Sequence, residues 1–221
     1  AMAHLTCVSH TAKEIDTVLT KLKNSDIENL MVLRGDPTVG TDHFIQPKGG
    51  YHNAGELISA VLKHSDFGIG AAGYPEGHVE NPDKDDDRKH LHGKIAAGAE
   101  FIVTQFFLDN TFFLRWRDIL RKEGANVPLV AGILPPPNWN ATSRMSKMCG
   151  VSIPEDLAEA LLKHENDPEA SKEIGYEHVA KQIEGLLLEG VEGVHLYALN
   201  SLETVKRLGP KLRDSAGTTS V

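Results

Sequence analysis

Short apolar runs alternate with amphipathic segments along almost the whole chain, and this alternation restricts the possible folds more than any other feature. The apolar runs span residues 2–8, 29–34, 67–74, 100–107, 127–134 and 193–199. Each run is continuous instead of alternating with polar residues, which is typical of strands buried on both faces of a parallel sheet. We therefore expect six buried strands.

Segments with helical spacing lie between these runs. Residues 12–23 place Ile15, Val18, Leu19 and Leu22 at positions i, i+3, i+4 and i+7, so their side chains share one apolar face. Further helices are expected over 56–63, 87–98, 111–123, 139–148, 154–163, 178–189 and 202–208. This repeated order of strand and helix predicts a parallel α/β fold, either a barrel or an open doubly wound sheet.

None of the apolar runs is followed by a dinucleotide-binding fingerprint or a Walker loop. The stretch "GIGAAGYPEG" (68–77) is rich in glycine but matches neither spacing. A dinucleotide-binding doubly wound sheet is therefore disfavoured. The pattern favours an α/β barrel of the (β/α)8 TIM type.

Length and charge limit the remaining possibilities. A chain of 221 residues fits one domain, which we expect over residues 1–208, with a linker or disordered tail at 209–221. A net charge of -8 argues against nucleic acid as a partner, and no apolar stretch approaches the length of a membrane span. Two cysteines without paired spacing favour a reduced, cytoplasmic setting.

Polar residues follow nearly every predicted strand. They are His4–Thr6, Arg34–Asp36, Tyr74–His78, Thr104–Gln105, and Tyr197 with Asn200. A single polar residue in such a place is usually a turn or a helix cap. Ligands of parallel α/β folds bind at the carboxyl ends of the strands, so the repeated pattern predicts a binding site there.

The predicted helix 87–98 carries a second polar cluster. Asp87, His90 and Lys94 lie at offsets 0, 3 and 7 and share one helical face. A carboxylate, a ring and a cation suit a ribose and a phosphate. The acidic run 85–87 also fits a plain helix cap that complements the helix dipole.

The histidines of this helix raise the alternative of a metal-dependent barrel hydrolase. His90 and His92 are two residues apart, so on a helix they point in different directions and share one ion poorly. No pair of histidines has the spacing of a zinc protease. We therefore expect no metal site.

Six motifs in order resemble the catalytic domain of methylenetetrahydrofolate reductase. They are "HLTC" (4–7), "LRGDP" (33–37), "AGYPEGH" (72–78), "DRKHLHGKIAAGAEFIVTQFF" (87–107), "GILP" (132–135) and "HLYALN" (195–200). The resemblance implies a TIM-type barrel that binds FAD and reduces 5,10-methylenetetrahydrofolate to 5-methyltetrahydrofolate. Electrons would come from NADPH or NADH and pass through the flavin in a ping-pong reaction, and the protein would be a homo-oligomer.

The resemblance also assigns the cofactor contacts. They are His4, Arg34, Gly35, Asp36, Asn53, Ala54, Tyr74, His78, Asp87, His90 and Lys94. Asp87, His90 and Lys94 would hold the ribose and diphosphate, in agreement with the helical face described above.

Two residues are the candidates for catalysis. Asp36 would stabilise the 5-iminium cation that the folate forms before hydride transfer, because a preorganised charge acts strongly in a water-poor site. Gln105 can both donate to and accept from the pterin edge. Tyr197 and Ser201 are the remaining candidates for substrate binding, although Ser201 stands where bacterial members carry an arginine that contacts the folate.

The resemblance places the first predicted strand at the third strand of the family's barrel. About six of the eight βα units are then present, and the glutamate that serves the family as general acid is expected upstream of Ala1. A catalytically incomplete flavin-binding remnant or assembly subunit is therefore the alternative to an active reductase.

Overall fold

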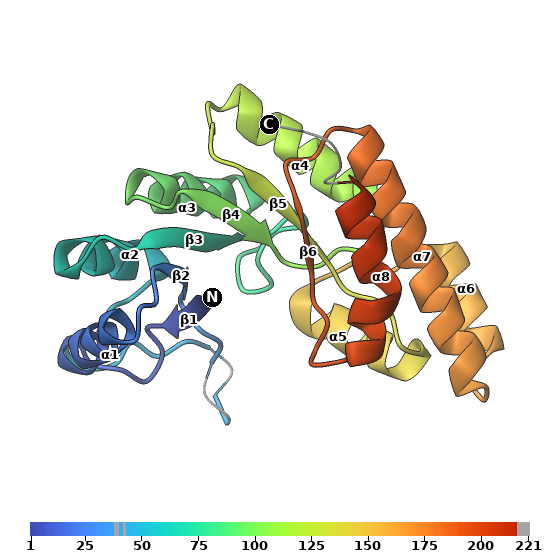
Figure 1. Cartoon of the computed structure of the whole chain (residues 1–221), viewed down its shortest axis with the longest axis horizontal. Helices are drawn as coiled ribbons and strands as arrows, with labels where there is room; N and C mark the ends of the chain where they lie inside the picture. Colours follow the sequence, from blue (N-terminus) through green and yellow to red (C-terminus); the bar gives the residue numbers. More distant parts are fainter. Residues whose placement is uncertain (38–39, 42, 216–221) are drawn as a thin grey trace. The chain divides into compact units, whose positions relative to one another are not determined.

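In the computed structural model, backbone is described for residues 1–37, 40–41 and 43–215, and side chains are described as far as Leu212. The strand order in the sheet follows the chain, β1-β2-β3-β4-β5-β6, and the described residues form eight helices (Figure 1). The expected fold class is confirmed: the chain is α/β, of the TIM-barrel type, with six βα units in the described part. It divides into two compact units, which we call unit 1 and unit 2.

Unit 1 comprises residues 1–73, 83–103 and 124–128. Its strands are β1 (Met2–Thr6), β2 (Asn29–Leu33), β3 (Gly68–Gly73) and β4 (Phe101–Thr104). The last residue of β4, Thr104, belongs to unit 2. The helices of unit 1 are α1 (Ala12–Asn24), α2 (Ala54–His64) and α3 (Lys84–Ala96). The strands β1, β2 and β3 pair in parallel, with Leu30 aligned to Ala3 on one side and to Ile69 on the other. α2 packs on β2 and α3 packs on β3 (Figure 1).

Local sequence explains the elements of unit 1. Thr11 and Glu14 form a capping box at the start of α1, because the Thr11 hydroxyl accepts from the Glu14 amide and the Glu14 carboxylate accepts from the Thr11 amide. The apolar face of α1 buries Ile15 and Leu19 completely. Gly70 lets β3 lie against Phe101, since a Cβ there would meet that ring at 2.5 Å.

Unit 2 comprises residues 74–82, 104–123 and 129–221. Its elements are α4 (Asn110–Lys122), β5 (Leu129–Ile133), α5 (Trp139–Cys149), α6 (Glu155–Lys163), α7 (Pro168–Leu188), β6 (Val194–Leu196) and α8 (Leu202–Ser215). β5 and β6 pair in parallel, and α7 contacts both α6 and α8 (Figure 1). Its core includes a cluster formed by Phe106, Leu108, Leu134, Val151, Leu157 and Leu161, which we call the unit 2 apolar cluster.

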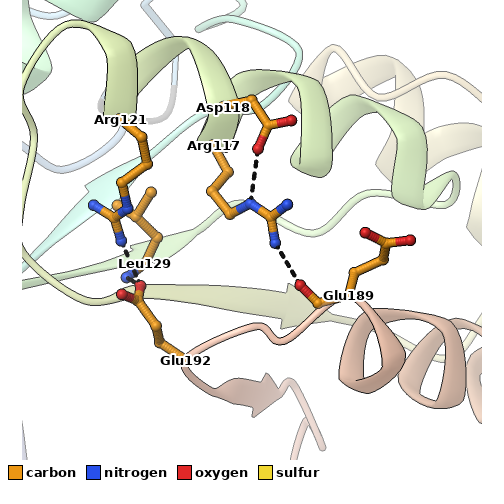
Figure 2. A network of polar contacts seen from close by, with 6 residues as sticks. All are labelled: Arg117, Asp118, Arg121, Leu129, Glu189 and Glu192. Carbon is orange, nitrogen blue, oxygen red and sulfur yellow. Dashed lines mark hydrogen bonds and ion pairs between the residues drawn. The ribbon is translucent and has the colours of Figure 1, made fainter.

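A polar network stabilises the amino end of β5. The Glu192 carboxylate accepts from Arg121 Nη2 at 2.6 Å and from the Leu129 amide at 2.7 Å (Figure 2). Nearby, Arg117 Nη1 donates to the carbonyl of Glu189, just beyond the end of α7, at 2.9 Å. These contacts tie α4 to the segment that leads into β6. Residues at this end of a parallel sheet usually serve stability.

Two predicted helix boundaries are wrong. α7 begins at Pro168, ten residues before the predicted start at 178, because Asp167 caps the helix and proline suits its first turn. α8 continues to Ser215, although the tail was expected to begin at Gly209. The proposed domain boundary at 208 remains a prediction, and residues 216–221 lie outside the described residues. None of the helices described here has both the length and the apolar character needed to cross a bilayer.

Candidate functional site

A pair of opposite charges on α3 is the most unusual electrostatic feature of unit 1. Asp87 is buried, and Lys94 lies two helical turns further along the same face. The Lys94 ammonium donates to the carbonyl of Ala72, near the end of β3, at 2.9 Å. We refer to Asp87 and Lys94 as the α3 charge pair.

Burial dominates the electrostatics of this pair. It lowers the pKa of Lys94 from 10.5 to about 8; Asp87 opposes the shift, and Arg34 adds to it. Burial also raises the pKa of Asp87, against the stabilising charge of Lys94. Both charged forms are therefore disfavoured by lost hydration, and each only partly compensates the other. An additional anion near Lys94 and Arg34 would reduce the repulsion between these two cations.

The third member of the predicted face, His90, does not join the pair. Its side chain is 64% exposed, and its Nε2 lies 3.3 Å from the carboxylate of Asp86. Among the residues that the structure describes, no group of three or more histidine, cysteine or acidic side chains could hold a metal ion.

The turn after β2 brings Arg34, Gly35 and Asp36 to the carboxyl end of that strand. The Arg34 guanidinium lies over the ring of Phe44, with its carbon 5.0 Å from the ring centroid. Gly35 has a φ of +90°, and a Cβ there would come within 2.4 Å of Val8, so the turn requires glycine. Asp36 is exposed to solvent.

The other predicted cofactor residues of unit 1 lie on two separate elements. His4 is exposed on β1. Asn53 is the N-cap of α2, and its side-chain oxygen accepts from the Glu56 amide at 3.0 Å. Ala54 is buried, so it can offer a ligand little more than its backbone at the helix start.

In unit 2, Tyr74 and His78 form a pair in the loop that follows β3. Their rings meet edge to face, with centroids 4.6 Å apart. The contact brings two predicted cofactor residues together in one small loop. Both side chains are half-buried, and their contact with a cofactor remains a prediction.

Gln105 follows the last residue of β4, Thr104, which makes two hydrogen bonds to other segments. The Gln105 side-chain oxygen accepts from the Phe106 amide at 3.0 Å. The preceding residue, Thr104, is buried and bonded twice: its hydroxyl accepts from the Gly132 amide at 2.8 Å, and its carbonyl accepts from the Tyr197 hydroxyl at 2.8 Å. Burial raises the pKa of Tyr197 to about 12. Because the Tyr197 hydroxyl already donates its proton to Thr104, it can offer a substrate only an acceptor.

Ser201 lies immediately before α8, where it caps the helix. Its hydroxyl accepts from the Thr204 amide at 3.1 Å. This cap accounts for the serine without a ligand. Whether Ser201 also contacts the substrate remains a prediction.

The sequence had indicated Thr104 and Tyr197 as strand-end residues, but not the bond between them. Gly132 completes the group, since a Cβ there would come within 2.1 Å of the Thr104 carbonyl oxygen. The signal available in advance was the glycine in "GILP", which lies inside a predicted strand where close backbone approach is a usual reason for glycine.

Comparison with known proteins gives a consistent result. The family model described as "Methylenetetrahydrofolate reductase" matches residues 1–212. "Methylenetetrahydrofolate reductase 1" of Schizosaccharomyces pombe is 35% identical over 211 residues, which are 95% of this chain and 35% of that protein. "Methylenetetrahydrofolate reductase (NADH) 1" of Arabidopsis thaliana is 37% identical over 210 residues, 90% of this chain and 36% of that one. The chain thus spans about a third of the length of these relatives.

A bacterial relative and a solved structure extend the comparison. "5,10-methylenetetrahydrofolate reductase" of Escherichia coli is 33% identical over 203 residues, covering 92% of this chain and 67% of that protein. Among solved structures, an uncharacterized protein from Clostridium thermocellum, described as binding two copies of 5-methyl-5,6,7,8-tetrahydrofolic acid, matches with a TM-score of 0.56. The match covers 96% of this chain and 72% of that one, and at 16% identity it supports the fold alone.

Proposed function

We propose, since the chain belongs to the methylenetetrahydrofolate reductase family, that it carries out the reduction of 5,10-methylenetetrahydrofolate to 5-methyltetrahydrofolate. FAD is the proposed cofactor, with NADH or NADPH as electron donor in a ping-pong reaction. The cofactor would supply the hydride chemistry, and the protein would supply position and charge. We further propose that the protein is a cytoplasmic homo-oligomer acting in one-carbon metabolism and methionine biosynthesis.

The observation that carries the proposal is the α3 charge pair. A lysine with its pKa lowered to about 8 by burial is costly to keep charged. A diphosphate beside Lys94 and Arg34 would offset this cost, because opposite charges attract strongly where water is scarce. Asp87 can accept from a ribose hydroxyl. The residues present in unit 1 thus fit the adenosine diphosphate portion of FAD.

The remaining proposed cofactor contacts have smaller roles. Gly35 and Ala54 would offer backbone atoms, and His4 and Asn53 would offer polar side chains. His90 would reach the cofactor only by turning away from Asp86, with which it is paired now. Tyr74 and His78 would contribute their rings and polar tips.

On the substrate side, we assign Gln105 to the pterin ring. Its amide would donate and accept along the pterin edge once it leaves the Phe106 amide. Asp36 would stabilise the 5-iminium cation through its carboxylate. Tyr197 would act through Thr104, holding the end of β4 so that Gln105 starts from a defined position.

The test is a pair of half-reactions measured by rapid mixing with the purified protein. We expect NADH or NADPH to bleach the flavin absorbance, and methylenetetrahydrofolate to restore it. A protein that binds FAD but performs neither half-reaction would support the incomplete remnant instead. A protein that binds no FAD would contradict the proposal.

One substitution distinguishes the two proposed roles of Asp36, which are contact with FAD and stabilisation of the folate cation. Asp36→Asn removes the charge but keeps the shape, so it should slow the folate half-reaction by about tenfold or more while FAD affinity changes little. Equal losses in the rate of the folate half-reaction and in FAD affinity would assign Asp36 to cofactor binding alone.

A further inference from the structure

We propose that Glu76 is a positioning residue, which holds Tyr74 and His78 in place by anchoring their loop to the segment after α5. The proposal rests on the proposed function, because it assumes that the two rings contact the cofactor. The loop comprises residues 74–82, and we call it the β3–α3 loop. All contacts described below lie within unit 2.

The β3–α3 loop carries its own hydrogen bonds. The Gly77 amide donates to the Tyr74 carbonyl at 3.0 Å, and the Asn81 amide donates to the His78 carbonyl at 2.8 Å. Gly77 has a φ of 92°, which favours glycine. The loop is therefore two consecutive turns, and the rings of Tyr74 and His78 meet on it.

One bond in the loop sets the chemistry of His78. The Glu80 amide donates to Nδ1 of His78 at 3.1 Å. Because Nδ1 accepts this bond, the neutral ring carries its proton on Nε2. The loop thus selects the tautomer of His78 that carries its proton on Nε2.

Glu76 fastens this loop to a distant part of the chain. Its two carboxylate oxygens lie 3.0 and 3.2 Å from the amide nitrogen of Ser152, 76 residues further along the chain. The donor is a backbone group, so the contact does not depend on the serine side chain. A bond to a charged acceptor is stronger than one between neutral groups.

Ser152 is exposed, but the residue before it is well packed. Val151 is 8% exposed and belongs to the unit 2 apolar cluster, which also includes Phe106, the residue after Gln105. The Val151 amide donates to the Ser146 carbonyl at 2.9 Å, so the turn that ends α5 is closed. Within the loop, Pro75 is buried and Val79 is 56% exposed.

The Glu76 bond therefore connects the loop that carries the proposed cofactor residues with the core beside the proposed substrate residue Gln105. The unit 2 apolar cluster lies beside Gln105 through Phe106, and it holds the β3–α3 loop through Val151, Ser152 and Glu76. Without the Glu76 bond, the loop would lose this attachment to the segment after α5, and its internal turns would open more often. Tyr74 and His78 would then need to be ordered when FAD binds, which lowers affinity.

The test compares FAD affinity, measured by quenching of flavin fluorescence, across a set of variants. Glu76→Ala should weaken binding by about tenfold, because it removes one charge-assisted bond. Glu76→Gln keeps one acceptor oxygen and should recover most of the affinity. Ser152→Ala is the matched control: it keeps the backbone donor and should bind FAD within about twofold of the unmodified protein.

A second pair of variants tests the bond itself. Ser152→Pro removes the donor, so its loss should match that of Glu76→Ala, and the double variant should lose no more than either single one. Unchanged affinity in Glu76→Ala would overturn the proposal. So would a Glu76→Gln variant as weak as Glu76→Ala, since glutamine keeps an acceptor oxygen for the Ser152 amide.

Hydrogen exchange tests, independently of FAD, whether Glu76 anchors the β3–α3 loop. In the cofactor-free protein, Glu76→Ala should raise exchange at the amides of Gly77 and Asn81, whereas the amides of β5 should be unaffected. If the unmodified protein bound no FAD, the proposed function would fail, and the exchange result would still decide whether Glu76 anchors the loop. Unchanged exchange would overturn the inference.

Discussion

Two groups of charged residues illustrate opposite uses of charge in this chain. In the α3 charge pair of unit 1, Asp87 is buried and Lys94 is half-buried, and the pKa values of both are shifted in the direction that disfavours charge. The Glu192 network of unit 2 is half-exposed, with the side chains of Arg121 and Glu192 29% and 42% exposed. In that network, the carboxylate satisfies a guanidinium and a backbone amide at once (Figure 2).

We propose that the difference distinguishes a ligand-binding group from a group that stabilises the fold. Lys94 donates to a carbonyl at the carboxyl end of β3 and carries a desolvation cost. Glu192 completes its bonds within the protein, at the amino end of β5. In barrel folds these two ends serve function and stability respectively. Substitutions in the two groups should therefore change different properties.

The largest expected effect is on cofactor binding. Lys94→Glu replaces a cation by an anion beside the proposed diphosphate, so FAD affinity should fall by about a hundredfold or more. Equilibrium titration of FAD into the purified variant measures the change. An affinity like that of the unmodified protein would show that the α3 charge pair does not face the cofactor.

The matching change in the Glu192 network should affect stability instead. Glu192→Ala leaves the Leu129 amide and Arg121 without their carboxylate, so the free energy of unfolding should fall by about 1–2 kcal/mol. Denaturant unfolding of the cofactor-free protein measures it. FAD affinity should be unchanged, and a parallel loss of affinity would remove the distinction between the two groups.

The dependence on pH should have opposite signs for stability and for binding. The folded pKa of Lys94, about 8, is below its ordinary value of 10.5, so between these pH values the unfolded chain holds more protons. The stability of the cofactor-free protein should therefore gain a contribution as pH rises from about 8 to 10.5. FAD affinity should fall as pH rises through about 8, because the ammonium is lost.

Lys94→Met is the control for this pair of profiles. It removes the titrating group, so both slopes above pH 8 should flatten relative to the unmodified protein. Profiles that keep their slopes in Lys94→Met would assign the titration to another residue.

The smallest expected effect belongs to Arg117. Its bonds to Asp118 and to the Glu189 carbonyl lie at the surface, where ion pairs contribute little. Arg117→Ala should lower the free energy of unfolding by less than about 1 kcal/mol, without a change in FAD affinity. A loss as large as that of Glu192→Ala would show that the network acts as one unit.

Periodicity predicted the elements of the fold well, because continuous apolar runs and helical spacing are local properties. The start of α7 was missed, although Asp167 and Pro168 are a recognisable start signal, because the apolar face becomes clear only further along the helix. The same local reasoning found Asp87 and Lys94. On a helix they are separated by only about 20° around the axis, and His90 lies about 60° from Asp87, toward solvent.

The contacts that join distant segments could not be predicted. The bond between Tyr197 and Thr104 joins residues 93 positions apart, and the bond between Glu76 and Ser152 spans 76. Nothing in the spacing of single residues specifies such partners. Strand-end polarity indicated that Tyr197 belongs to a site, but only the structure shows that its hydroxyl donates to a backbone carbonyl.

The central claim is that the α3 charge pair binds the adenosine diphosphate portion of FAD. The most direct test titrates FAD and riboflavin, which lacks that portion, into the cofactor-free protein and into Lys94→Met. The account predicts that Lys94→Met weakens FAD binding by about tenfold or more and leaves riboflavin binding unchanged. An equal loss for both ligands, or no loss for FAD, would contradict it.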